Sequence, residues 1–379
     1  MEITKELDRI YAPIKEDLQM VEKRLYDLVP TDMDPISTVE KYLLDNGGKR
    51  LRPALVLLSV RAVHSSNASD ESASSNLSSA GAPLLSYAIA FAAAAELIHT
   101  ATLVHDDLLD GSVLRRGNGT INSKWGSEVA VLLGDHLYLK ATEILTSENL
   151  LNIEELRTFR QIHRASNLML QTAAKIFKGE VLQHRKRGKL STSAEDYFSI
   201  IESKSASFIS SCCMIGALLD GDTCPGADQI LASYGLNLGM AFQIRDDILD
   251  LMGDEEKIGK AVGSDLKEGR LTLPVIHLVE NAGNGERKYL KSVLEASSRK
   301  RNSLFHRLRC SFGSNHNGFD KKQLQHIRKL MLDNGSIEYS MNIASNFAQA
   351  AKKDLEKIPD SSAKQSLLSL ADHVMMREN

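Results

Sequence analysis

Apolar positions along this chain recur at helical spacing, in long stretches rich in Ala, Leu, Glu and Lys. Alternation of apolar and polar residues, which is typical of half-buried strands, is rare. The 379 residues include eight prolines, and Gly or Pro separates many of the stretches. We therefore predict an all-α fold, with helices near 3–28, 35–63, 84–110, 125–147, 152–187, 194–219, 227–252, 272–282, 286–309, 320–334 and 336–375.

The serine-rich segment 64–83 interrupts this pattern and contains few bulky residues. Such a segment cannot bury enough apolar surface to order itself, so we predict a flexible surface insertion. It is not interpreted as a linker, because the helices on either side carry residues expected to act together. No repeat of fixed period is visible. We expect residues 1–379 to form one large helical bundle around a central apolar cavity.

Composition narrows the function classes. Hydrophobic residues make up 42% of the chain and charged residues 25%, and the net charge of -3 favours no nucleic-acid partner. The four cysteines lack CxxC spacing, which argues against structural zinc and for a reducing compartment. The N-terminal sequence has no targeting pattern, so a cytoplasmic protein is expected. The most apolar run, 84–95, is interpreted as a buried helix too short to span a membrane.

Two acidic clusters of the form DDxxD each close an apolar helical stretch. The first contains Asp106, Asp107 and Asp110, and the second contains Asp246, Asp247 and Asp250. On a helix these three positions share one arc, so their carboxylates repel one another unless a counter-charge is present. Mg²⁺ binds one or two carboxylates together with substrate phosphates. Each cluster therefore looks like half of a diphosphate site.

A solvated helix face is the ordinary explanation for one such cluster. The presence of two, each after an apolar stretch and each followed by cations, makes the metal interpretation stronger. Arg115 and Arg116 follow the first cluster, and arginine offers a planar fork of donors for phosphate oxygens. After the second cluster, a glycine-punctuated loop carries Lys257, Lys260, Lys267 and Arg270.

A second diphosphate clamp is predicted near the N-terminus. Lys49 and Arg52 lie three residues apart at a glycine-rich helix start, although a solvated basic turn would explain them alone. His99 shares nearly the same helix face as the first acidic cluster and could reach the same anion, although a lone histidine is more often structural. The basic run 184–189 lacks aromatic residues and is interpreted as a solvated helix end.

These motifs resemble the trans-isoprenyl diphosphate synthases, the polyprenyl synthetase family. The resemblance covers 39–274 by motif and the remaining C-terminal helices in character. It implies that the two aspartate triplets hold Mg²⁺ around an allylic diphosphate, and that an isopentenyl double bond attacks the carbocation left by ionisation. It further implies that proton loss to the released diphosphate completes an all-trans elongation step.

The resemblance also implies individual roles. Arg115 matches a ligand of the allylic substrate, and Lys260 matches a lysine of a late loop. The positions matching ligands of isopentenyl diphosphate are Lys49, Arg52, His99 and Arg116. Lys204 with Ser205 matches a Lys-Thr pair, with the hydroxyl retained, and Gln243 matches a glutamine before the second motif. Arg270 stands where a lysine is common. Lys204 and the aspartates Asp106, Asp107, Asp110, Asp246 and Asp247 are the predicted catalytic residues.

Product length depends on the residues that floor the chain tunnel in this family. Ala101 and Thr102 occupy the two positions, and both are small, so a deeper tunnel is expected with Ile98 and either Leu137 or Tyr138 as its floor. Close helix packing is the ordinary explanation for small residues there. We expect a product longer than four prenyl units.

Several alternatives remain open. The chain could make geranylgeranyl or farnesyl diphosphate, act as a terpene cyclase, or serve as a non-catalytic subunit of a heteromeric synthase. Intact acids in both motifs argue against the last, and a cyclase rarely needs both motifs together with Lys49 and Arg52. Family resemblance implies a homodimer. The apolar pattern predicts no transmembrane segment, and peripheral membrane contact is considered for product release.

Ala101→Phe tests the tunnel assignment. An aromatic ring at this position should block the growing chain, so the variant should release shorter products than wild type. Chain-length analysis of the products measures this directly. An unchanged length distribution would reject the placement of the floor at Ala101.

Overall fold

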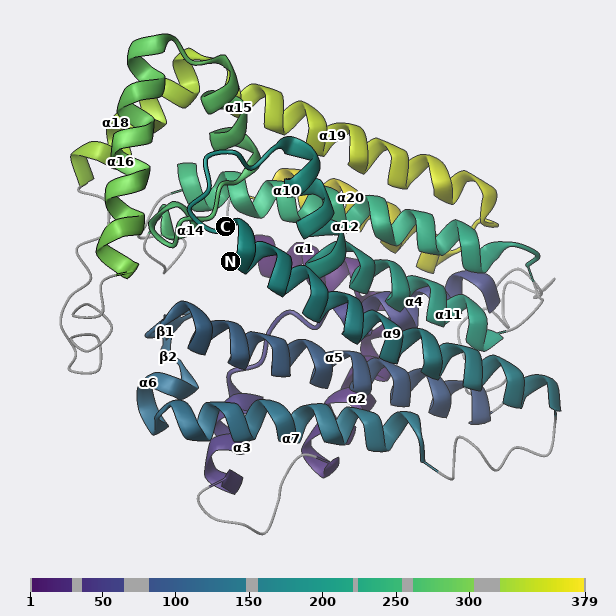
Figure 1. Cartoon of the computed structure of the whole chain (residues 1–379). Coiled ribbons are helices and arrows are strands. Elements are labelled where there is room, and N and C mark those ends of the chain that lie inside the picture. Colours follow the sequence, from purple (N-terminus) through teal and green to yellow (C-terminus); the bar gives the residue numbers. More distant parts are fainter. Residues whose placement is uncertain are drawn as a thin grey trace.

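The structure is a computed structural model, and it describes residues 2–28, 36–64, 82–147, 156–220, 224–253, 262–302 and 321–377. Long helices dominate these residues, which confirms the all-α prediction (Figure 1). Residues 65–81, which form most of the predicted insertion, lie outside the described residues, as do Lys257 and Lys260.

Helices α1 to α7 precede residue 146. They are α1 (Glu2–Ile10), α2 (Lys15–Leu28), α3 (Ile36–Asp45), α4 (Leu51–His64), α5 (Ala82–Asp110), α6 (Ile121–Trp125) and α7 (Ser127–Leu145). The later helices are α9 (Leu156–Lys186), α10 (Ala194–Ile201), α11 (Ser207–Asp220), α12 (Ala227–Met252), α14 (Ser264–Lys267), α15 (Leu273–Asn281), α16 (Asn284–Asn302), α18 (Lys321–Asp333), α19 (Ser336–Asp354) and α20 (Ser362–Met376). Short 3-10 helices cover Ala12–Ile14 and Leu355–Lys357.

Three predicted helices are interrupted. Pro13 sits in the 3-10 turn that separates α1 from α2, and Pro359 lies between α19 and α20. Proline lacks the backbone N–H that a continuing helix needs, which explains both breaks. Between α3 and α4, Gly47 and Gly48 are followed by Arg50 in a left-handed conformation with φ of 50°. This last break creates the loop that carries Lys49.

A small antiparallel hairpin follows the first acidic motif, where only a loop was expected. Strand β1 (Leu114–Arg115) pairs with β2 (Asn118–Gly119), so that Arg115 lies opposite Asn118. The two turn residues, Arg116 and Gly117, have φ of 51° and 79°. Positive φ at both positions is typical of the tight type I′ turn, which suits the twist of a hairpin.

The core lies between α4, α5, α9, α11 and α12, and it is dominated by buried aliphatic residues and alanines. Its large buried rings include Phe91, Phe208 and Tyr234, whose hydroxyl donates to the Leu367 carbonyl at 2.7 Å. Helix α12 also packs against α19, and α5 packs against α7. A smaller cluster joins α15, α16 and α18 at one end of the bundle (Figure 1).

Helix α5 is more membrane-like than the sequence analysis suggested. Its segment Pro83–Asp110 is long and apolar enough to cross a membrane, contrary to the expectation that the apolar run is too short. However, 67% of its most apolar window is buried inside the protein, and core helices pass the same test. The prediction of a buried helix is therefore confirmed.

A π-helical turn (Glu202–Ala206) divides the helix predicted at 194–219 and carries Lys204 and Ser205. Two glycines allow neighbouring helices to approach it closely. A Cβ on Gly179 of α9 would lie 2.7 Å from the Lys204 backbone nitrogen, and one on Gly239 of α12 would lie 2.6 Å from the Ala206 Cα. Turns of this kind are frequent at functional sites, because they redirect side chains out of the regular helix.

The two acidic motifs end α5 and α12 at the same end of the bundle, near the hairpin and α14 (Figure 1). The fold therefore brings both motifs and the π-helical turn into one region.

Candidate active site

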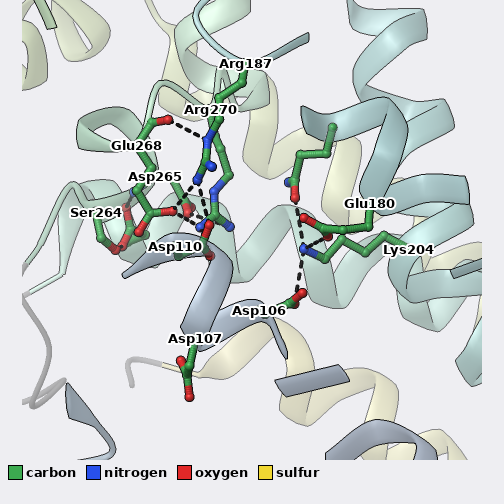
Figure 2. A network of polar contacts seen from close by, with 12 residues as sticks. Asp106, Asp107, Asp110, Glu180, Arg187, Lys204, Ser264, Asp265, Glu268 and Arg270 are labelled. Atoms are coloured by element: carbon green, nitrogen blue, oxygen red, sulfur yellow. Dashed lines mark hydrogen bonds and ion pairs between the residues drawn. The ribbon is translucent and has the colours of Figure 1, made fainter. Parts of the chain in front are cut away.

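The first acidic motif points its carboxylates in two directions (Figure 2). Asp106 faces the π-helical turn, where its carboxylate lies 3.2 Å from the Lys204 ammonium. Asp110 accepts hydrogen bonds from Arg187 at 2.6 Å and from Arg270 at 2.5 Å. Asp107 turns away and accepts two hydrogen bonds from Arg115, both at 2.8 Å. The three aspartates lie on one helix, as predicted, but their carboxylates bind different partners.

The second motif is held by a different set of partners. Asp247 is buried and accepts hydrogen bonds from the Tyr197 hydroxyl at 2.7 Å and from Gln243 at 2.9 Å. Asp246 pairs with Arg377 at 3.0 Å. Asp250 accepts hydrogen bonds from the Ser264 hydroxyl at 2.5 Å and from the backbone N–H of Asp265 at 3.1 Å.

Arg270 links the two motifs, as Figure 2 shows. Its guanidinium contacts Asp110 at 2.5 Å and Asp265 at 3.5 Å, and it also pairs with Glu268. Because the Asp265 backbone binds Asp250, a short chain of contacts joins the last acids of the two motifs. The two triplets therefore lie near each other, as the sequence analysis required.

A pocket opens beside this network. Its lining includes Lys204 and Ser205 from the π-helical turn, Gln243 and Asp247 from α12, and Arg270 from the loop before α15. The sequence-predicted residues Ser205 and Gln243 thus meet Lys204 at one place. Lys204 is itself held by Gln183 at 2.9 Å and by Glu180.

Burial makes the acids of this site costly to ionise. It raises the pKa of Asp106 despite the nearby Lys204 ammonium. Burial, together with the carboxylates of Asp265 and Asp246, raises the pKa of Asp247 well above its ordinary value. Burial also opposes ionisation of Asp110, but Arg270 and Arg187 overcome it and hold the pKa of that carboxyl below its ordinary value. Additional positive charge near Asp106 and Asp247 would stabilise their ionised forms.

The carboxylates of the two acidic motifs are oxygen ligands of the kind that divalent cations prefer, but they do not converge on one point. Among the described residues, no three His, Cys, Asp or Glu side chains are grouped to hold a metal ion. Mg²⁺ needs one or two carboxylates when phosphate oxygens supply further ligands, so the donor set fits a metal that arrives with a diphosphate. The motif aspartates already have partners, and bound metal would have to replace some of them.

The residues predicted to form the second diphosphate clamp also lie close to one another. Burial, followed by the charges of Arg377 and Arg116, lowers the pKa of Lys49, whose neighbours include Asp246. Burial, with Arg52 and Arg116 nearby, lowers the pKa of His99 well below its ordinary value, so this ring is neutral at pH 7. Arg52 is half-buried, and its guanidinium lies over the Phe208 ring at 5.0 Å. Lys49, Arg52 and Arg116 thus form one cationic cluster, with the neutral His99 ring beside it.

The glycine-rich loop explains how Arg116 reaches this cluster. Gly48 has no Cβ, and a Cβ there would overlap the Arg116 guanidinium. The backbone of the loop and the arginine at the hairpin tip can therefore lie face to face. A side chain at position 48 would force them apart.

A buried acid stabilises the cationic cluster. Glu96 lies on α5 and is 5% exposed, and its carboxylate accepts a hydrogen bond from Arg50 at 2.7 Å. Arg50 also pairs with Glu22 of α2. The negative charge of Glu96 also opposes the burial that lowers the pKa of both Arg52 and Arg116. Sequence reasoning missed this acid, because an isolated Glu in an apolar helix gives no sign of its partner.

Arg187 corrects the interpretation of the basic run. Residues 184–189 were expected to be a solvated helix end, which is wrong for this arginine: its side chain is 11% exposed and binds Asp110. Tyr197 and Arg377 were also missed, and each binds an aspartate of the second motif. None of these partners lies near its aspartate in the sequence.

The predicted tunnel residues are mostly buried. Ile98 and Ala101 are 1% and 0% exposed, whereas Thr102 is half-buried and donates its hydroxyl to the His99 carbonyl at 2.7 Å. Tyr138 is half-buried, and Leu137 lines a second pocket shared with His99 and Arg116. Their role in chain length stays a prediction.

The chain matches the polyprenyl synthetase family over residues 34–308. It is 31% identical over 363 residues to a short chain isoprenyl diphosphate synthase of Methanothermobacter thermautotrophicus, covering 95% of this chain and 96% of that protein. Identity to the octaprenyl diphosphate synthase of Escherichia coli is 29% over 373 residues, covering 98% and 99%. A crystal structure of polyprenyl synthase from Caulobacter crescentus CB15, complexed with calcium and isoprenyl diphosphate, is 29% identical with a TM-score of 0.77 and covers 98% of both chains. The predicted fold type is thereby confirmed.

Glu96→Gln tests the buried counter-charge. The variant keeps the side-chain size but removes the charge that Arg50 faces, so we expect a loss of about 2 kcal/mol in the free energy of unfolding. Urea unfolding measures this loss.

Glu143→Gln is the matched control. Glu143 pairs with Lys140 at 3.1 Å but is 67% exposed, and we expect a change below about 0.5 kcal/mol. Equal losses in the two variants would show that burial of Glu96 adds nothing to stability.

Proposed function

This chain belongs to the polyprenyl synthetase family, and we propose that it condenses isopentenyl diphosphate with an allylic diphosphate, using Mg²⁺, to make products longer than four prenyl units. Family membership makes it a trans-prenyl diphosphate synthase. Enzymes of this family use a divalent metal, and the Caulobacter relative is complexed with calcium. The choice of Mg²⁺, the product length and the role of each residue are the proposed parts.

One observation carries the proposal: two DDxxD motifs from different helices meet through Arg270, beside a pocket lined by Lys204 and Asp247. We assign the metal to Asp106 and Asp110 of the first motif, with Asp107, and to Asp246, Asp247 and Asp250 of the second. Bound Mg²⁺ would draw negative charge from the departing diphosphate.

The cations of the chain then divide between two diphosphates. Arg115, Lys204 and Arg270 lie beside the first motif or the pocket, where they stabilise the negative charge that grows on the leaving group. Lys49, Arg52 and Arg116 hold the diphosphate of the attacking substrate. Lys260 lies outside the described residues, and its role rests on the sequence motif alone.

His99 is suited to a neutral role in this arrangement. Because its pKa is well below the ordinary value, it can donate one hydrogen bond to the diphosphate held by Arg52 and Arg116 without adding charge. The buried apolar side chains around α5 limit the entry of water. A carbocation formed there would meet the isopentenyl double bond rather than a hydroxyl group.

Product length is proposed from the small residues Ala101 and Thr102. The relatives do not fix it, since they include both a short chain synthase and an octaprenyl synthase. A geranylgeranyl or farnesyl synthase is the main alternative, and a catalytically silent subunit is another.

A homodimer is proposed from an exposed apolar stripe on α7. Val131, Leu132 and Leu139 are 43%, 60% and 68% exposed. Leu132 and Leu139 are seven residues apart and therefore share one face of the helix. A second copy of this helix would cover the stripe in a symmetric contact.

The purified protein, mixed with MgCl₂, farnesyl diphosphate and labelled isopentenyl diphosphate, should incorporate label without any added partner. Chain-length analysis should give products above four prenyl units. Products that stop at four units would support the geranylgeranyl alternative, and no incorporation would support the silent subunit.

Asp106→Ala and Asp246→Ala test the assignment of the acids in the same assay. Each should lower turnover by at least about 100-fold, because each removes an acid proposed to hold the metal. Thermal unfolding checks that both variants remain folded. Near-normal turnover in either variant would contradict the proposal for its motif.

Leu132→Lys combined with Leu139→Lys should convert the dimer into a monomer, since two charges on the stripe oppose burial. Light scattering coupled to size exclusion gives the mass of each form. A wild-type monomer, or a double variant that stays dimeric, would refute an interface through α7.

A further inference from the structure

The C-terminal end of α9 reaches into the first acidic motif. Arg187 donates to the Asp110 carboxylate at 2.6 Å and to the Glu268 carboxylate at 3.2 Å (Figure 2). Its Nε donates to the Glu268 carbonyl at 2.8 Å. The side chains of Arg187, Asp110 and Glu268 are 11%, 14% and 18% exposed, so solvent screens these contacts only in part.

These contacts place two guanidinium groups on one carboxylate. Arg187 binds Oδ1 of Asp110, and Arg270 binds Oδ2 at 2.5 Å. Both oxygens are therefore engaged by the protein itself. A divalent cation can gain an oxygen of Asp110 only if at least one of these arginine contacts is broken or lengthened.

We propose that Arg187 is a resident competitor for the divalent cation at Asp110, so that it raises the metal concentration the enzyme requires. The inference rests on the proposed function, in which Asp110 is a metal ligand. Arg187 is a positioning residue in this scheme, because it acts on the metal through Asp110. When the cation arrives, the guanidinium keeps Glu268 as its partner, and no charge is left buried alone.

The local fold does not depend on this side chain. The backbone N–H of Gly188 donates to the Gly269 carbonyl at 2.7 Å, which ties the end of α9 to the loop before α15. Gly269 has φ of 75°, and a Cβ there would lie 3.3 Å from the Gly188 nitrogen. Since the backbone already makes this connection, the Arg187 side chain can exchange partners while the loop stays in place.

The test is a titration of the full-length protein with MgCl₂, followed by its thermal unfolding temperature. It is run with the metal alone and again with inorganic diphosphate at a fixed concentration. In Arg187→Gln, the Mg²⁺ concentration that gives half of the stabilisation should be about fivefold lower than in wild type, which corresponds to one lost ion pair of ordinary strength. A purely structural role would lower the unfolding temperature without moving this midpoint.

Arg185→Gln is the matched control, because Arg185 is exposed two residues away and removing it makes the same change in net charge. Its midpoint should equal that of wild type. Arg187→Lys keeps the charge but loses the planar fork, and its midpoint should lie between those of wild type and Arg187→Gln. If Arg187→Gln does not fold, this variant decides the question by the same comparison.

An unchanged or higher midpoint in the Arg187 variants overturns the competitor role and leaves the proposed function standing. An equal decrease in Arg185→Gln also overturns it, since the effect would then come from net charge alone. If neither wild type nor the variants are stabilised by Mg²⁺ with or without diphosphate, both the proposed metal and the competitor role fail.

Discussion

Asp110 and Arg270 meet at 2.5 Å beside the pocket, and much of the site is arranged around this ion pair. A partly buried carboxylate is stable only with positive charge close by, and the chain supplies that charge from a loop far along the sequence. Helix α14, which directly precedes that loop, fixes Asp250 through Ser264 and the Asp265 backbone. Folding the loop against α5 and α12 therefore sets the distance between the two acidic motifs.

A neighbouring region presents the reverse problem, because it concentrates positive charge. Lys49, Arg52 and Arg116 lie close together, and burial lowers the pKa of each. Glu96 offsets part of this charge from within the core. The cluster still carries excess positive charge, which suits an anionic ligand such as a diphosphate. Helix α5 thus lies beside a region rich in carboxylates and a region rich in basic side chains.

The helical class, the acids and most of the cations could be predicted from the sequence, because periodicity and the repeated DDxxD spacing are local signals. The partners could not. In the sequence, Arg187 stands at a helix end, Glu96 within an apolar helix and Tyr197 near a helix start, and nothing there indicates their partners. The fold places Arg187 beside Asp110, Glu96 beside Arg50 and Tyr197 beside Asp247. Such pairings depend on tertiary contacts, about which short sequence windows carry no information.

The sequence analysis also missed two local departures from regular helix, each of which depends on a few residues. The π-helical turn at Glu202–Ala206 lies inside a stretch with strong helical periodicity, and its position depends on close approach at Gly179 and Gly239. The hairpin requires positive φ at Arg116, which is uncommon for a residue with a side chain. Neither feature has a propensity signal strong enough to override the surrounding helices.

The hairpin lets two consecutive arginines contact different parts of the site. Arg115 lies on a strand and reaches back to Asp107, while Arg116, at the turn, packs on Gly48. At this turn the chain therefore directs two consecutive guanidinium groups to different partners: Arg115 binds Asp107 of the acidic motif, and Arg116 joins the cationic cluster. Insertion of one residue would rotate the pair out of phase, so the length of this connection is as strictly constrained as the identity of either arginine.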